Sequence, residues 1–350
     1  MKIVNKRRNI LVFLLSFVML VGCSTNISVP KDTTGEGMSE EQVRKGYEVD
    51  YFKVSSMIKE NVDQDVVDAA LTVIEAFLNY EVRANVVVSG NEYRFLNDMG
   101  YVIQCTCPMF SAFTIYDEMT WYDSERQVVE WEFLVSQAEF KTITEEFSEK
   151  VDEYLSVVDK EDSDSMKAIL LYYKLIQDTS YDYDILGDAY ETMDKKQYHL
   201  RTSSYNVLVN KTGICTNLSQ ALMFLYTQVD LASGTVLHQG GAGSHMWAVV
   251  KIDEQYSYCD PTWDVGASLK TFGITSSDRS SWAGEYTKEG GMMLDTVVAL
   301  KYSVDDERFV TLRQKVPVEI TDIKVDKIKQ TITFEGYEYE YTFHCGNVER

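Results

Sequence analysis

Basic residues are scarce in this chain of 350 residues, which contains 33 Lys and Arg against 55 Asp and Glu and carries a formal net charge of −22. A protein that binds nucleic acid needs a basic patch to displace the counterions of the phosphate backbone. Apart from a short basic head at residues 2–8, the sequence contains no such patch. We therefore expect no nucleic-acid partner, and the acidic surface favours neutral or cationic substrates.

Histidine and cysteine are also few, with four and six residues. Zinc sites usually separate paired ligands by roughly two to four residues, whereas Cys105 and Cys107 are separated by a single residue. We therefore expect no metal site and no cofactor. Free structural thiols are the simpler expectation for the cysteines, and disulfides of an exported chain are the alternative.

The apolar run near the N-terminus, residues 10–21, is too short for a comfortable membrane span. It follows the basic head and precedes Cys23, which is the layout of an export signal. LVGC at residues 20–23 resembles the bacterial lipobox, in which the chain is cut before the cysteine and that cysteine is acylated with fatty acids such as palmitate. The resemblance implies a signal peptide at residues 1–22 and a lipid anchor at Cys23 that holds the protein outside the cytoplasm, on the bacterial cell membrane. The alternative is an ordinary cleaved signal peptide with an incidental cysteine.

A flexible tether is predicted at residues 23–43, which are rich in Ser, Thr, Gly and charge. Residues 44–160 then read as a small α+β domain. Apolar residues at helical spacing predict a helix over residues 63–80 with Asp63 as its N-cap, and alternation predicts a strand over residues 82–88.

Farther along this domain, residues 113–116 and 127–133 flank a turn-like DSER and predict a β-hairpin, before a longer polar helix over residues 139–158. The domain carries no chemical motif. Packing and substrate docking are both open as its role.

A charged stretch at residues 159–165 predicts the boundary to a second domain at residues 161–305, which begins with an amphipathic helix over residues 166–177. The alternation of apolar and polar residues between Ile323 and Phe343 predicts a small antiparallel sheet in a C-terminal extension, residues 306–350.

A cysteine precedes the helical pattern of apolar residues between Leu218 and Tyr226, so Cys215 is expected at or near the helix N-terminus, with Gly213 permitting the tight approach to it. Unpaired N–H groups and the helix dipole stabilise a thiolate there and lower the pKa of the thiol. The same N–H groups suit the oxyanion of a tetrahedral intermediate.

A cysteine nucleophile needs a base, and His245 is the candidate because it opens a strand-like run after a glycine-rich loop. If a two-residue loop at residues 253–254 joins this strand to the next, Asp260 lies opposite Trp247 and diagonal to His245 on the same face. An odd-length loop without a bulge would separate them. The other histidines lack a cysteine or carboxylate in motif spacing and are expected to be structural or exposed: His199, His238 and His344.

KTGIC before a helix, SHMWAVVKI and CDPTWD resemble the three core motifs of the transglutaminase-like superfamily, over about residues 165–275. The resemblance implies an α+β fold of papain-like architecture, with a cysteine at a helix N-terminus packed on an antiparallel sheet that carries histidine and aspartate. It maps Cys215, His245 and Asp260 onto nucleophile, base and orienting acid. Trp247 and Trp263 are then core or cleft-wall residues.

The sequence also departs from the family. Animal-type members have Trp directly after the catalytic cysteine and carry calcium sites, whereas Thr216 follows here and no calcium-ligand loop is present. A side-chain oxyanion donor is not evident; Tyr205 and Asn206 qualify by position only, and core or loop roles are the alternative.

These observations predict a lipid-anchored extracytoplasmic cysteine enzyme that performs acyl transfer or hydrolysis on peptide or carboxamide bonds, with protein or peptide substrates at the cell envelope. Two alternatives remain. In one, the same fold is a non-catalytic binding or assembly module, and Cys215 is a relic or forms a disulfide, for example with Cys259. In the other, the chain is a surface receptor or scaffold in which residues 44–160 do the work.

Overall fold

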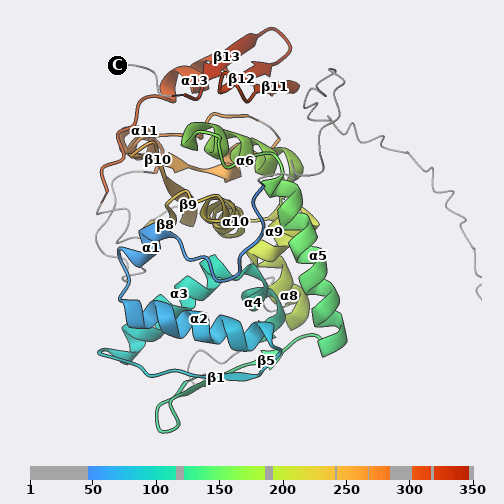
Figure 1. Cartoon of the computed structure of the whole chain (residues 1–350), viewed down its shortest axis with the longest axis vertical. Coiled ribbons are helices and arrows are strands. Elements are labelled where there is room, and N and C mark those ends of the chain that lie inside the picture. The colour runs from blue at the N-terminus through green and yellow to red at the C-terminus, as the bar shows by residue number, and fades with distance from the viewer. Residues whose placement is uncertain are drawn as a thin grey trace, which may run out of the picture.

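The computed structural model describes residues 46–115, 122–185, 192–240, 243–266, 268–283, 302–316 and 319–346 (Figure 1). Helices and small, mostly antiparallel sheets are mixed in it, which confirms the expected α+β class. The signal peptide, the lipidated Cys23 and the tether fall outside these residues and stay predictions. Within the described residues, no helix is both long and apolar enough to cross a membrane.

Helices dominate the N-terminal part of the chain. The one that covers Gln64–Leu78 confirms the helix predicted over residues 63–80, with Asp63 at its N-cap position. The longer polar helix begins two residues earlier than expected, because Ser136 and Glu139 form a capping box. In chain order these helices are α1 (Ser56–Lys59), α2 (Gln64–Leu78), α3 (Glu92–Thr106), α4 (Pro108–Phe113) and α5 (Gln137–Leu155).

The predicted hairpin is only partly right. Its second strand is broken at Trp131, which is buried and packs its ring against Phe110 in the core. Its residues Glu132–Phe133 pair with Thr114–Ile115 as expected. Its residues Val128–Glu130 instead pair with Arg83–Asn85 and with a short strand at Tyr122–Asp123. The strands are β1 (Arg83–Asn85), β2 (Thr114–Ile115), β3 (Tyr122–Asp123), β4 (Val128–Glu130) and β5 (Glu132–Phe133), in the sheets β1-β4-β3 and β2-β5.

The second part of the chain contains a three-stranded antiparallel sheet of order β10-β9-β8 and the helices around it. The amphipathic helix predicted over residues 166–177 is confirmed as α6. The elements are α6 (Asp164–Asp178), β6 (Ser180–Tyr181), η1 (Tyr183–Ile185), α8 (Lys195–Arg201), α9 (Ser204–Asn210), β7 (Thr212–Gly213), α10 (Cys215–Gln228), β8 (Ser233–Gly240), β9 (Gly243–Ile252), β10 (Gln255–Cys259), η2 (Pro261–Trp263) and α11 (Ser276–Ala283).

Helix α10 lies at the centre of the molecule (Figure 1). The sheet covers it through β9 and β8, and α3, α5, α6 and α9 contact it from other directions. Every residue from Asn217 to Gln228 is buried. A helix surrounded on all sides belongs to the core rather than to the surface of a protein, so the residue at its first position has a rigid support.

The C-terminal part confirms the predicted small antiparallel sheet, at one end of the molecule in Figure 1. Its elements are α13 (Val310–Lys315), β11 (Asp322–Asp326), β12 (Thr331–Glu335) and β13 (Glu340–His344). Buried apolar residues from Val54 to Cys345 form one continuous cluster. The domain boundaries at residues 160 and 305 stay predictions, and the residues on either side of them share a core.

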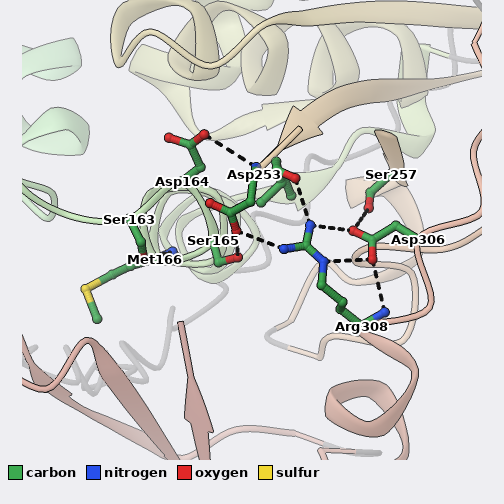
Figure 2. Close-up of polar contacts among 9 residues, drawn as sticks. Ser163, Asp164, Ser165, Met166, Asp253, Ser257, Asp306 and Arg308 are labelled. Carbon is green, nitrogen blue, oxygen red and sulfur yellow. Dashed lines mark hydrogen bonds and ion pairs between the residues drawn. The ribbon is translucent and has the colours of Figure 1, made fainter. Parts of the chain in front are cut away.

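A polar clamp holds the turn between β9 and β10 (Figure 2). Arg308 donates to Asp253 Oδ2 at 2.9 Å and to the carbonyl of Ile252 at 2.7 Å, and it also bonds the buried Asp306. From the other side, Ser165 at the start of α6 donates to Asp253 Oδ2 at 2.6 Å. The segment before the C-terminal sheet and the first turn of α6 therefore fix one end of this hairpin.

Gly213 precedes α10 where two helices approach closely. Its backbone φ is not positive, so the left-handed conformation is not what requires glycine here. A Cβ at this position would lie 2.5 Å from Val207 Cγ2 and 3.1 Å from Asn217 Cβ. The chain can therefore run this close to α9 and α10 just before Cys215 only because residue 213 has no side chain.

Gly213→Ala should destabilise the protein by about 1–3 kcal/mol, because the added methyl group overpacks the contact between α9 and α10. The measurement is the midpoint of urea unfolding. Gly100→Ala in α3 is the matched control, since a Cβ there meets nothing within 4 Å. This control should be neutral or stabilising by up to about 1 kcal/mol, and equal effects of the two substitutions would contradict the packing argument.

Candidate active site

Cys215 is the first residue of α10, as the sequence predicts. The strand β7 just before it pairs in parallel with β6, and Asn217 bonds back to the backbone N–H of Ile214 at 3.3 Å. Asn217 also donates to the carbonyl of Thr202 at 2.6 Å. These contacts hold the start of the helix, and the half-buried thiol lies beside its first N–H groups.

The turn between β9 and β10 has two residues, Asp253 and Glu254, with φ values of 47° and 69°. Positive φ at both central residues is the requirement of a type I′ turn, the tightest common hairpin connection. On either side of it, Ile252 pairs with Gln255. The even loop length assumed from the sequence is therefore confirmed.

This turn sets the register that brings His245 and Asp260 together. The ladder runs to the pair Ala248 and Cys259, so the next residues, Trp247 and Asp260, lie opposite each other. Side chains two apart on a strand share a face, which puts His245 diagonal to Asp260. Their side chains meet, with His245 Nε2 2.7 Å from Asp260 Oδ2.

The His245 imidazole also interacts with the Cys215 thiol, and this interaction shifts the pKa of both groups. Since Nε2 faces Asp260, Nδ1 is the nitrogen left to face the sulfur. Burial raises the pKa of Cys215, but the hydrogen bonds from His245 and from the backbone of Met246 outweigh it, and the pKa falls below its ordinary value. Burial lowers the pKa of His245, but the bonds to Asp260 and Cys215 raise it to about 9. These opposite shifts favour the thiolate–imidazolium form of the pair.

Asp260 is fully buried, and its backbone is held as firmly as its side chain. Thr271 Oγ1 and the Tyr172 hydroxyl donate to the Asp260 carbonyl at 2.7 and 3.1 Å, and the Asp260 N–H donates to the Thr271 carbonyl at 3.1 Å. Arg279, which the sequence did not single out, lies with Nη1 3.6 Å from Asp260 Oδ2. The carboxylate therefore has a fixed position and two basic neighbours.

The two tryptophans near the site differ in exposure. Trp247 is fully buried beneath the imidazole, with ring centres 6.0 Å apart, so it supports His245 from inside the core. Trp263 is 63% exposed and lies 6.0 Å from the same imidazole. Of the two cleft-wall candidates, Trp263 alone offers surface that a substrate can contact.

The two positional candidates for a side-chain oxyanion donor have structural roles. Tyr205 is buried and its ring packs on Phe113 and Phe147, while Asn206 donates to the Thr212 carbonyl at 2.8 Å. A residue the sequence did not suggest, Tyr181 in β6, interacts electrostatically with Cys215, and burial raises the pKa of its hydroxyl. The SYDYD segment that ends α6 contained this tyrosine, but only the β6–β7 pairing aims it at the site.

The other histidines and cysteines make no described side-chain contact with Cys215, His245 or Asp260, although His238 of β8 is the backbone partner of His245 in the β8–β9 ladder. His199 is half-buried, and burial lowers its pKa; His344 is exposed on β13; the side chain of His238 is outside the described residues. Cys215 and Cys259 are both free thiols, so the alternative disulfide between them is wrong. Cys105, Cys107 and Cys345 are free and buried as well. No group of His, Cys, Asp or Glu in the described parts of the chain has the geometry of a metal site.

The described arrangement, a cysteine at the start of a helix packed on an antiparallel sheet with histidine and aspartate, is the fold expected from the resemblance. A solved structure of "a TGase" matches 52% of this chain and 48% of its own at 16% identity, with a TM-score of 0.31. A candidate cysteine protease from Cytophaga hutchinsonii matches 29% of this chain and 32% of its own at 11% identity, with a TM-score of 0.22. The chain thus spans about half or less of these proteins. No family model and no curated protein matches it. At these TM-scores, the case for the site rests on its own geometry.

Alkylation of Cys215 by iodoacetamide should reach its plateau at lower pH than that of an ordinary thiol, because the thiolate is the reactive form and its pKa is lowered. His245→Ala removes the cation that stabilises the thiolate while burial remains. Its alkylation midpoint should therefore rise by about one pH unit or more.

His199→Ala is the matched control and should leave the midpoint of Cys215 unchanged. Cys215→Ala should abolish labelling of the folded protein, since the other described cysteines are buried. An unchanged midpoint in His245→Ala would show that the imidazole does not act on the thiol.

Proposed function

We propose that this protein is an extracytoplasmic cysteine enzyme of transglutaminase-like type, in which Cys215, His245 and Asp260 act as nucleophile, general acid–base and orienting acid. The observation that carries the proposal is the placement of His245, which bonds the buried Asp260 carboxylate at 2.7 Å and interacts with the thiol of Cys215. A cysteine kept only for packing needs no such partner.

In the first half of the reaction, the Cys215 thiolate forms a bond to the carbonyl carbon of a carboxamide or peptide group. The carbonyl π electrons move to oxygen, and the C–N bond breaks when the tetrahedral intermediate collapses to a thioester. The leaving amine takes the proton of the His245 imidazolium, and Asp260 holds the ring in the orientation that delivers it.

In the second half, neutral His245 accepts a proton from a water molecule or from a primary amine as that nucleophile attacks the thioester. The C–S bond breaks, and the sulfur departs as the thiolate. Water yields a carboxylic acid, and an amine yields a new amide. The site chemistry is the same for hydrolysis and transfer, so access of the second nucleophile decides between them.

The backbone N–H of Cys215 suits the oxyanion, because it lies at the N-terminus of a fourteen-residue helix. The Tyr181 hydroxyl, which interacts electrostatically with Cys215, would donate its proton to the same oxyanion. Exposed Trp263 would border the bound chain on the side of His245.

The lipobox-like LVGC and the acidic composition support the place and the substrate class that we propose. The mature protein would be held by lipid at Cys23 on the outer face of a membrane, where protein or peptide chains of the cell envelope reach the site. Net negative charge favours neutral or cationic segments of such chains.

The test of the reaction is turnover of a glutamine-containing peptide, with and without a small primary amine. Wild type should release ammonia, Cys215→Ala should release none, and Asp260→Asn should be slower by about tenfold or more, because a neutral amide stabilises the imidazolium less than the carboxylate does. Amine incorporation identifies transfer and its absence identifies hydrolysis. If Cys215 neither turns over amides nor reacts faster than a denatured-state thiol at neutral pH, the fold serves as a binding module.

The anchor is tested separately. In a bacterial host, wild type should incorporate a palmitate analogue and sediment with membranes, whereas Cys23→Ser should do neither. Cys105→Ser is the control for a cysteine substitution away from the proposed anchor. Membrane recovery of Cys23→Ser equal to that of wild type would exclude the lipid anchor.

A further inference from the structure

The Asp260 carboxylate has a second basic neighbour beside His245. Arg279 Nη1 lies 3.6 Å from Asp260 Oδ2, the same oxygen that bonds His245 Nε2 at 2.7 Å. The side chains of Arg279 and Asp260 are only 4% and 0% exposed, so solvent screens their interaction poorly. One carboxylate oxygen is thus shared between a permanent cation and a titratable one.

Trp247 lies against both cations. The guanidinium carbon of Arg279 is 3.9 Å from the centre of the indole ring, within cation–π distance. The His245 ring is 6.0 Å from the same indole. Because Trp247 is fully buried, it gives the guanidinium group a rigid surface to rest on.

The local backbone fixes where Arg279 points. It lies in the first turn of α11, just after the segment that bridges to β10 through Ile274. The Thr275 N–H donates to Asp278 Oδ2 at 2.9 Å, and Arg313 Nη2 bonds the same oxygen at 2.7 Å. The start of the helix is therefore tied down on both sides, and Arg279 extends from it toward Asp260.

We propose that Arg279 is a positioning residue of this site: it holds the Asp260 carboxylate in the place where it bonds His245, and its permanent charge helps to set the pH range in which the thiolate and the imidazolium coexist. The meaning of that range for catalysis rests on the proposed function. The charge effect itself is a property of the folded protein.

The direction of the charge effect follows from electrostatics. A permanent cation disfavours a proton on His245 and favours loss of the proton from Cys215, so it lowers the pKa of both groups. Asp260 acts in the opposite direction. Arg279 thus offsets part of the buried negative charge and keeps the thiolate available at lower pH.

Other titratable groups face the same place, and among the described residues Arg279 is the permanent cation that lies 3.6 Å from Asp260. Tyr181 of β6 interacts electrostatically with both Cys215 and Asp260. Asp278, on the helix that carries Arg279, is already paired with Arg313. The described groups around the site are Tyr172 (α6), Tyr181 (β6), Cys215 (α10), His238 (β8, by its backbone pairing with His245), His245 (β9), Asp260 (after β10), Asp264 (after η2), Asp278 and Arg279 (α11) and Arg313 (α13).

The test compares the pH dependence of Cys215 alkylation in wild type and in Arg279→Met, a readout that needs no turnover. Removing the cation should shift the alkylation midpoint upward by about one pH unit. Arg279→Lys keeps the charge but loses the planar contact with the indole, and its midpoint should stay close to that of wild type. Arg279→Gln takes the place of Arg279→Met, with the same expected shift, if the latter does not fold.

The matched control is Arg308→Met, which removes another arginine of an ion-pair cluster at the opposite end of the β9–β10 hairpin, about 20 Å away at ~3.3 Å per residue. It should lower the unfolding midpoint in urea and leave the alkylation midpoint unchanged. Coincident midpoints of wild type and Arg279→Met, or equal shifts in Arg279→Met and Arg308→Met, would overturn the proposal.

The shift of the alkylation midpoint in Arg279→Met and the turnover of amides can be distinguished from each other. If wild type fails to turn over amides but Arg279→Met still shifts the midpoint, the positioning role stands and the enzyme assignment falls. If amides are turned over and the midpoints coincide, the enzyme assignment stands and Arg279 is a structural residue only.

Discussion

The hydrogen bond between His245 Nε2 and Asp260 Oδ2 is the interaction on which the rest of the site depends. It exists because a two-residue turn sets the register of β9 and β10, and a slip of one residue would point Asp260 to the other face of the sheet. The turn itself is clamped by Arg308 and by the start of α6. Segments far from the thiol in sequence therefore stabilise the hairpin that carries both residues.

Because the Asp260 carboxylate is buried, the residues that contact it depend on one another. A carboxylate with no exposed surface is costly unless charged and hydrogen-bonding partners surround it. Asp260 has His245 and Arg279 for its side chain and Thr271 for its backbone. Removing one partner leaves a buried charge only partly compensated, so each member of the group constrains the others.

The N-terminal helices have a structural place that explains their lack of a chemical motif. α3 and α5 contact α10, the helix that carries Cys215, and Gln104 of α3 bonds Gln220 of α10 at 3.3 Å. Their apolar residues belong to the same buried cluster as the strands that carry His245 and Asp260. These helices cover α10 and give Cys215 a rigid support. They leave its thiol half-buried at the first turn of α10.

Sequence alone was enough to predict the cysteine at a helix start, the histidine on a strand and the aspartate opposite Trp247, because helix and hairpin periodicities are local and a two-residue turn fixes which side chains share a face. It did not reveal Arg279 or Tyr181, since neither lies in a periodic pattern that points at the thiol. It also missed the break of the 127–133 run at Trp131, and it left open whether Trp247 belongs to the core or to a cleft wall, which its full burial decides. Contacts of this kind join segments distant along the chain, and only the packing of those segments into one core decides them.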